Sequence, residues 1–154
     1  MKKFLYLISF IFIYACGFEP VNLSNINNYN ISKVNVEGEK RINFLIRNKL
    51  LNSTQRVDNP VIVIDLITNK NKIIKEKNIK NEITKYEISI TTEVNVYLRD
   101  KESLHKFTLS NNGIFDVSNQ NSITRNNEKK LINLLSEDMA EKIIYRLNKY
   151  LNDL

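Results

Sequence analysis

Cys16 is the residue of this chain whose type and position most clearly indicate a specific chemistry. It is the only cysteine among 154 residues, and it follows an apolar run, Phe4–Ala15, that begins after two lysines. A basic start, about a dozen apolar residues and a small final residue are typical of a secretory signal peptide. The run is too short for a membrane-spanning helix, which needs roughly 20 apolar residues. We therefore predict a signal peptide over residues 1–15, with cleavage before Cys16.

The four residues that end this run resemble a bacterial lipobox, the sequence at which a signal peptidase cleaves before a lipid-modified cysteine. Ile13, Ala15 and Cys16 agree with a lipobox, whereas Tyr14 is bulkier than usual. In such proteins the thiol is joined to a diacylglycerol, and several acyl chains, at about 0.8 kcal/mol per buried CH₂, form a firm anchor. The alternative is a free buried thiol in a core strand, which a position inside a hydrophobic leader disfavours. We expect Cys16 to be lipidated.

No other group of residues has the pattern of a catalytic or metal site. Catalysis needs a nucleophile with a base, a pair of carboxylates or a metal cluster. The only histidine, His105, lies beside Lys106 and lacks the His, Cys or Glu partners of a metal site. The three glycines are scattered and cannot form a phosphate-binding loop: Gly17, Gly38 and Gly113. We predict no enzymatic activity, no cofactor and no metal.

The chain carries an excess of positive charge, with 23 Lys and Arg against 17 Asp and Glu and a formal net charge of +6. Loss of Lys2 and Lys3 with the signal peptide leaves +4. A basic protein favours anionic partners, and export argues against nucleic acid as that partner. Phosphorylated lipid, an anionic membrane surface and an acidic protein remain. The alternative is that Lys, Asn and Ile are simply abundant in this sequence.

Hydrophobic periodicity predicts the order of elements in the mature chain. Residues 16–30 are polar and turn-prone and are expected to form a lipidated tether, followed by a single domain over residues 31–154. Apolar patterns predict strands at Ile31–Val36, Pro60–Thr68, Lys85–Leu98 and Leu104–Leu109, the last continuing weakly through Ile114–Val117. Apolar residues at helical spacing predict helices at Glu39–Asn52 and from a cap at Ser122 or Thr124 to about Asn152.

The strand Lys85–Leu98 is the clearest element, because its alternation gives one apolar and one polar face. Arg99–Ser103 is expected to join it to the next strand as an antiparallel hairpin. The Lys- and Asn-rich stretch Asn69–Asn81 lacks a clear period and is expected to be a hairpin tip or a loose loop. We predict an α+β fold in which two helices pack on one face of a small, mostly antiparallel sheet of about four strands, with a polar opposite face.

The leader ends in Ala15-Cys16-Gly17-Phe18, and it is followed by a short strand, a helix of the form Arg41–Leu50, three strands and a long final helix. In its leader and in this order of its elements, the sequence resembles the LptE family of lipopolysaccharide-assembly lipoproteins. The resemblance covers nearly the whole mature chain. It implies a non-enzymatic protein, lipid-anchored at the periplasmic face of the outer membrane, that plugs the large β-barrel LptD, helps it fold and contacts lipopolysaccharide. Gly17 agrees with outer-membrane sorting, because an aspartate there would signal retention in the inner membrane.

The contacts with lipopolysaccharide that this resemblance implies are expected to involve basic side chains. Arg99, Lys101 and Lys106 are our first prediction, because their turn is expected to be the exposed tip farthest along the sheet. Their charged groups would pair with the lipid phosphates. The lysines from Lys70 to Lys80 are the alternative site, although a solvated loop is the better explanation of this stretch.

The stretch Gly113–Arg125 is expected to meet the barrel wall, with Phe115 and Arg125 as the contacts to test. A competing interpretation is an accessory or structural envelope lipoprotein of a transporter complex. It shares the anchor, the size and the basic charge, but it does not require a stoichiometric barrel partner. An anchored enzyme is a third possibility that lacks a catalytic pattern.

Overall fold

The computed structural model describes residues 29–53, 61–98 and 103–152. The elements follow one another as β1 (Asn30–Gly38), α2 (Lys40–Asn52), β2 (Val61–Lys77), β3 (Ile83–Leu98), β4 (Ser103–Asp116) and α3 (Asn121–Asn152). The predicted signal peptide, Cys16, Arg99 and Lys101 lie outside the described residues.

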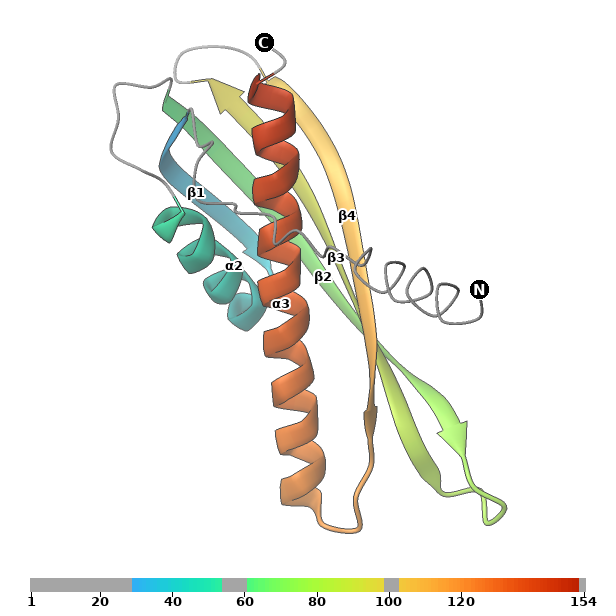
Figure 1. Ribbon diagram of the computed structural model, residues 1–154. Coiled ribbons are helices and arrows are strands. Elements are labelled where there is room, and N and C mark those ends of the chain that lie inside the picture. The colour runs from blue at the N-terminus through green and yellow to red at the C-terminus, as the bar shows by residue number, and fades with distance from the viewer. Residues whose placement is uncertain (1–28, 54–60, 99–102, 153–154) are drawn as a thin grey trace, which may run out of the picture.

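The four strands form one sheet in the order β1-β2-β3-β4. β1 pairs with β2 in parallel, whereas the β2–β3 and β3–β4 pairs are antiparallel. Both helices lie on the same face of the sheet, and α2 covers only the part beside β1 while α3 runs along most of its length (Figure 1). This arrangement confirms the predicted α+β fold. We call the two sides the helix-covered face and the open face.

The alternation along β3 decides which side of the sheet the helices cover. Its apolar side chains on the helix-covered face are completely buried, whereas most of the side chains between them are partly exposed. The buried set on the two central strands is Ile62, Ile64, Leu66, Ile88, Ile90, Val94 and Val96. The helices contribute Ile42, Ile46, Leu50, Leu135, Met139, Ile143 and Leu147. Burial of one such side chain contributes about 1.5–3 kcal/mol, so this layer is the main source of stability.

β1 departs from simple alternation because its register with β2 shifts between Ile31 and Lys33. The extra residue of this bulge, Ser32, donates a hydrogen bond to the carbonyl of Ile62 at 3.1 Å. Ile31 and Val34, three positions apart, are therefore both buried at 4 % exposure. The alternation in the sequence places Ile31 on the opposite side from Val34, and this part of the prediction is wrong.

β1 leaves the sheet at Gly38, where the chain turns into α2. Gly38 has a φ of +94°, and a side chain there would overlap the carbonyl oxygen of Thr68. The next residue, Glu39, donates its backbone N–H to that same oxygen at 3.1 Å. Inside α2, the buried side chain of Asn43 donates to the carbonyl of Glu37 at 2.9 Å, which ties the start of the helix to the end of the strand.

Beyond Thr68, β2 continues for nine residues that β1 no longer borders. Asn69–Lys77 is strand and pairs with β3, so the prediction of a loose loop is wrong for this part. Its sequence has no apolar alternation because both of its faces are largely exposed, and only pairing with β3 makes it extended. The hairpin tip is the short turn over residues 78–82. We call residues 69–91 of this hairpin the distal arm; its free end projects past the rest of the sheet (Figure 1).

α3 begins at Asn121, before either of the caps that the sequence suggests. Thr124 nevertheless stabilises the entry to the helix, although it lies inside it. Its Oγ1 accepts the backbone N–H of Ser118 at 2.9 Å and donates to the carbonyl of the same residue at 3.1 Å. With 32 residues the helix is about 48 Å long, long enough to follow the sheet to its far end.

On the open face, Glu87 joins the distal arm to β4. Its carboxylate accepts hydrogen bonds from Lys75 Nζ at 2.8 Å and from Asn112 Nδ2 at 2.7 Å. The Glu87 side chain is 12 % exposed. The ammonium group of Lys75, helped by the amide of Asn112, lowers the pKa of Glu87 below its ordinary value of 4.5. One buried carboxylate therefore holds three strands together.

Replacement of Gly38 by alanine should destabilise the fold by about 3 kcal/mol, because the new methyl group meets backbone in a conformation that L-residues rarely adopt. Gly113→Ala is the matched control. Its methyl group would lie 2.7 Å from the flexible end of Leu131, which can shift, and a loss of about 1 kcal/mol is expected. Urea unfolding of both variants measures the two losses. Equal losses would contradict the special role of Gly38.

Glu87→Gln should reduce the dependence of stability on pH. The folded pKa of Glu87 lies below its unfolded value, so its ionised form stabilises the fold above about pH 4.5, and this contribution is lost as the pH falls through the folded pKa. The variant should be less stable than the parent at pH 7 and closer to it at pH 3, as thermal unfolding would show. The control is Glu137→Gln, an exposed residue of α3. An equal effect of the two substitutions would count against the assigned role.

Candidate functional site

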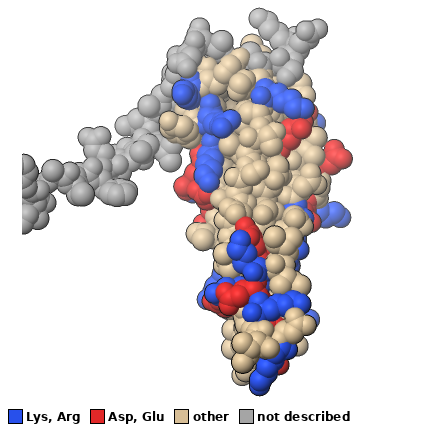
Figure 2. Space-filling model, turned by 90° about the vertical axis from the view of Figure 1, so that its right-hand side faces the viewer, with Lys and Arg blue, Asp and Glu red and all other residues tan. Residues whose placement is uncertain are grey.

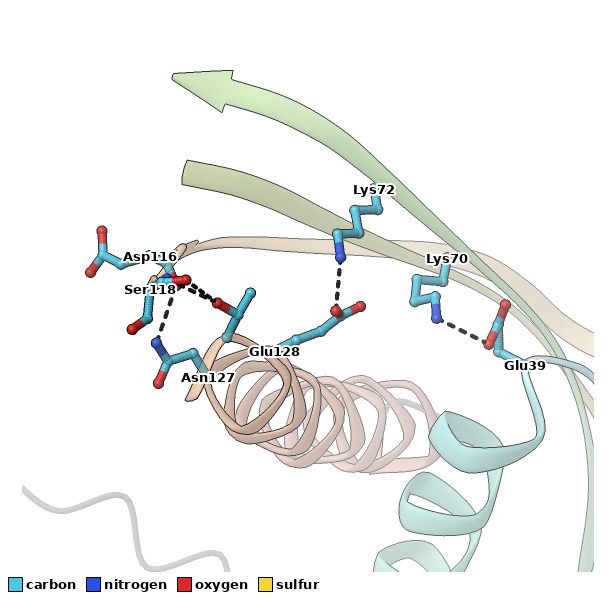
Figure 3. Close-up of polar contacts among 8 residues, drawn as sticks. Glu39, Lys70, Lys72, Asp116, Ser118, Asn127 and Glu128 are labelled. Carbon is cyan, nitrogen blue, oxygen red and sulfur yellow. Dashed lines mark hydrogen bonds and ion pairs between the residues drawn. The ribbon is translucent and has the colours of Figure 1, made fainter. Parts of the chain in front are cut away.

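The lysines of the distal arm point to both faces of the sheet. Lys70 and Lys72 lie on the helix-covered face, beyond the part that α2 covers, and each reaches a carboxylate (Figure 3). Lys70 Nζ lies 3.6 Å from Glu39, directly before α2, and Lys72 Nζ lies 2.8 Å from Glu128 of α3. These two ion pairs join the arm to both helices. Their side chains are 25–40 % exposed, so each pair contributes modestly to stability.

A pair of aromatic rings lies beneath Lys72. Tyr86 of β3 and Phe115 of β4 stack with their ring centroids 5.6 Å apart. The ammonium group of Lys72 lies 4.4 Å from the first centroid and 5.0 Å from the second. A cation over two aromatic faces adds to the attraction of Glu128 and fixes the side chain. Phe115 is only 5 % exposed, so this predicted barrel contact is a core side chain.

The other predicted barrel contact, Arg125, is exposed in the first turns of α3. It lies at the end of the molecule where β4 passes into α3. Hydrogen bonds to the backbone hold the segment between β4 and α3. Asn127 Nδ2 donates to the carbonyl of Asp116 at 3.1 Å (Figure 3). The backbone N–H of Val117 donates to the carbonyl of Thr84. Arg125 therefore lies at the surface of a helix whose start is tied to the end of β4.

The tip of the distal arm has a different composition from its base. Lys77 Nζ donates only to the neutral amide oxygen of Asn81, at 3.0 Å, and no hydrogen bond or ion pair of the Lys80 side chain is found among the described residues. Lys85 pairs with Glu76 at 2.7 Å. Ile79, between the two uncompensated lysines, is fully exposed. The tip therefore combines uncompensated positive charge with an exposed aliphatic side chain.

The predicted lipopolysaccharide contacts near the β3–β4 turn lie at the opposite end. Leu98 and Asn30 both pair with the start of β2, so this turn lies where the tether enters the sheet. The turn itself, with Arg99 and Lys101, lies outside the described residues, and the expectation that it is the exposed tip farthest along the sheet stays a prediction. Lys106 is 60 % exposed, and its Nζ lies 2.6 Å from Glu93. This ammonium group, together with Asn95, lowers the pKa of Glu93.

Residues 29–53, 61–98 and 103–152 contain no cluster of His, Cys, Asp and Glu that could hold a metal ion. His105 instead stacks on Tyr150 of α3, with the ring centroids 4.0 Å apart, and lies 5.5 Å from Phe107. Its position joins β4 to the end of α3, as expected for a structural residue of a strand. Among the helices of the same residues, none is both long enough and apolar enough to cross a membrane.

Sequence analysis does not identify Glu39, Glu128 or Tyr86 as part of this region. Glu128 lies 56 positions from Lys72, and Glu39 lies 31 positions from Lys70, so no local spacing connects them. The only signal in the sequence is the excess of lysine in the distal arm. For the two lysines that lie beside the helices, Lys70 and Lys72, partial burial favours a carboxylate partner.

Three solved structures share this fold. Rare lipoprotein B from Shewanella oneidensis matches with a TM-score of 0.60 and 17 % identity, over 79 % of this chain and 97 % of that one. A lipoprotein from Caulobacter crescentus, described as putative, matches with a TM-score of 0.58 and 16 % identity, over 85 % and 93 %. Lipoprotein B from Nitrosomonas europaea matches with a TM-score of 0.60 and 10 % identity, over 88 % of this chain and 93 % of that one. At these identities the likeness shows the fold alone.

Comparison with curated proteins gives no match. Comparison with family models does, because residues 18–147 match the LptE model, described as lipopolysaccharide-assembly. The match covers most of the chain, with the four strands, α2 and all but the last turn of α3. The resemblance that the sequence suggests is therefore confirmed, and the chain belongs to the LptE family of lipopolysaccharide-assembly lipoproteins.

Proposed function

We propose that this protein is a non-enzymatic outer-membrane lipoprotein, anchored through Cys16 at the periplasmic face, that plugs the β-barrel LptD and serves as its folding partner during lipopolysaccharide transport. The family supports a role in lipopolysaccharide assembly. The observation that favours a plug is the open face of the sheet. Neither α2 nor α3, the two helices of the described residues, covers it, although it belongs to a long and well-packed sheet (Figure 1). A face of this kind needs either water or a polar partner.

The open face has a central group of polar, uncharged side chains, and around it lie charged residues and apolar ones such as Ile67, Ile73 and Ile114. Neighbouring strands align amide and hydroxyl side chains there, and Thr91 and Ser110 share a hydrogen bond of 3.1 Å. The set is Asn69, Asn71, Ser89, Thr91, Ser110 and Asn112. Figure 2, which shows the side of the molecule that bears β4, has a broad uncharged region with charged groups at its margins and across its lower part. The interior of a large membrane barrel is also polar, so such a surface suits the lumen.

The length of the sheet is compatible with this position. β2 has 17 residues and spans about 56 Å at 3.3 Å per residue. A bilayer with its headgroups is about 40–45 Å thick. A domain tethered at the start of β1 and standing along the barrel axis would therefore reach across the whole membrane. This geometry supports a plug more than it supports a compact accessory subunit.

Two clusters of basic residues are proposed to contact lipopolysaccharide phosphates. The first prediction, Arg99, Lys101 and Lys106, places the contact at the tether end. The second, the distal arm, is favoured by the charges, because Lys106 already has a carboxylate partner and Lys77 and Lys80 have none among the described residues. An ammonium group without a carboxylate partner loses no ion pair when it binds phosphate. The second candidate function is that of an accessory or structural envelope lipoprotein. Such a protein would have the same anchor but no barrel partner.

The barrel partnership predicts the outcome of a purification from the outer membrane. A C-terminally tagged protein, extracted in mild detergent, should recover a large β-barrel in about equal amount. Photocrosslinking groups at Arg125 and at the open-face residue Thr108, both exposed, should be captured by that barrel. A sample kept in the dark is the control. Recovery of the protein alone, or with inner-membrane transporter subunits, would remove the plug role and favour the accessory one.

The charges at the tip of the distal arm predict which lysines contribute to lipopolysaccharide binding. The Lys77→Gln/Lys80→Gln variant should bind lipopolysaccharide more weakly by a factor of about 10–30, at about 1 kcal/mol for each charge near an anionic lipid surface. The variant with alanine at Arg99, Lys101 and Lys106 should lose less. Lys33→Gln, an exposed position on β1, is the matched control. Titration of the purified protein with lipopolysaccharide measures all three, and a larger loss from the triple variant would return the site to the tether end.

A further inference from the structure

Ile79 is the most exposed large hydrophobic side chain among the described residues, with a relative exposure of 103 %. Others on the surface, such as Phe44 and Leu134, are 63 % exposed and rest partly on their helices. Scattered surface hydrophobic residues need no explanation. Ile79 differs because it lies at the extreme end of the distal arm, where it contacts no part of the fold that could bury it.

The turn that carries Ile79 is held by a closed set of hydrogen bonds. Asn78 Oδ1 accepts the backbone N–H groups of Lys80 and Glu82 at 2.9 and 3.0 Å, and Asn78 N–H donates to the Glu82 carbonyl at 2.9 Å. Asn81 takes a left-handed conformation, with φ of 62°, and its N–H donates back to Asn78. None of these bonds involves the side chain of Ile79. The turn thus holds the backbone at position 79 in place and exposes its side chain. Its hydrogen bonds do not require an isoleucine at this position.

Positive charge surrounds this isoleucine on both sides. Lys77 and Lys80 have no carboxylate partner among the described residues, whereas Glu76 is already paired with Lys85. The Glu82 carboxylate accepts a hydrogen bond from the neutral amide of Asn78 and has no cationic partner among the described residues either, so Lys77–Glu82 carries one net positive charge. The lower end of the molecule in Figure 2 is largely uncharged surface with Lys and Arg at its edge and some Asp or Glu nearby. An apolar tip between two cations is complementary to a lipid surface, which places anionic headgroups around a hydrocarbon interior.

We propose that the tip of the distal arm, Ile79 with Lys77 and Lys80, inserts into an anionic lipid surface. Ile79 enters the boundary between headgroups and acyl chains, and the two ammonium groups pair with lipid phosphates. This deepens the proposed contact with lipid, and it rests on the proposed anchor at Cys16 but not on the barrel. A pocket in a partner protein is the other way to cover Ile79, and the experiment below separates the two.

The position of the tip determines which lipid it meets. Asn30, where the tether joins the sheet, pairs with Val61 at one end of β2, and the tip lies beyond the other end, about 56 Å away. In a domain that stands upright on the leaflet of its proposed anchor, the tip lies away from that leaflet. The lipid surface that it reaches is a different one, either the opposite leaflet or another membrane.

One isoleucine and two lysines bind a membrane only weakly by themselves. A single acyl chain already gives only marginal and reversible binding, and the tip buries less apolar surface than such a chain. Attachment through the anchor changes this, because it confines the tip near the second surface at a high effective concentration. The tip therefore acts as a second contact of an anchored protein, and loss of the anchor abolishes its effect.

The test is a vesicle-tethering experiment with the mature lipidated protein. The protein is reconstituted into donor vesicles of phosphatidylcholine and mixed with labelled acceptor vesicles that contain phosphatidylglycerol. Donor vesicles should capture the acceptors, and Ile79→Asn should weaken capture about 10- to 100-fold. Lys77→Gln and Lys80→Gln should each weaken it about fivefold. The matched control is Ile73→Asn, on β2 in the same distal arm and 48 % exposed, which should leave capture unchanged.

The arms of the experiment distinguish the possible failures. Capture of pure phosphatidylcholine acceptors to the same extent, or loss of capture in inorganic phosphate at constant ionic strength, would overturn an anionic lipid surface as the partner. Unchanged capture by Ile79→Asn would overturn the role of the isoleucine, and no capture by the parent protein would leave a protein pocket as the occupant. Floatation of the protein with its donor vesicles is measured in each case, so failure of the proposed anchor is seen separately.

Discussion

The structure depends on the burial of one face of its sheet. β3 pairs with strands on both sides, and its alternation places Ile88, Ile90, Val94 and Val96 together on one face, completely buried. Because this apolar stripe runs along most of the sheet, it needs a cover of similar length, and α3 with about 48 Å provides it. The two described helices, α2 and α3, then lie on the same side of the sheet. The polarity of the open face follows directly, since its side chains alternate with those of the buried stripe.

The early departure of β1 gives the two ends of the sheet different properties. Gly38 turns the chain away from the sheet at Thr68, so α2 covers only the tether end and the remainder of β2 continues without it. On this uncovered part, lysines replace isoleucines on the helix-covered face. They are tolerated there because Glu39 and Glu128 lie within ion-pair distance, at 3.6 and 2.8 Å. A buried apolar layer thus passes into a polar one along a single strand.

This division relates the fold to a role in lipopolysaccharide assembly. The tether end packs tightly, and the chain that leads to Cys16 enters the sheet there. The distal arm has fewer apolar contacts, a turn fixed by its own hydrogen bonds, and positive charge at its tip. This distribution agrees with the proposed anchor at one end and the proposed contact with an anionic lipid at the other. One continuous sheet joins the two ends, and the described residues contain no hinge between them.

The sequence alone determined the class of the fold and the side of the sheet that is buried, because a period of two over Lys85–Leu98 and a helical period over the last thirty residues are local properties. The predicted lipobox at Cys16 also rests on a local pattern, whereas the resemblance to the LptE family rests on the order of elements along nearly the whole mature chain. The tertiary structure decided what has no local signal. Asn69–Lys77 became strand through pairing with β3, Phe115 became a core residue under Lys72, and Glu128 met a lysine 56 positions away. Such contacts arise only when distant segments are brought together, so their residues show no spacing that a sequence could reveal.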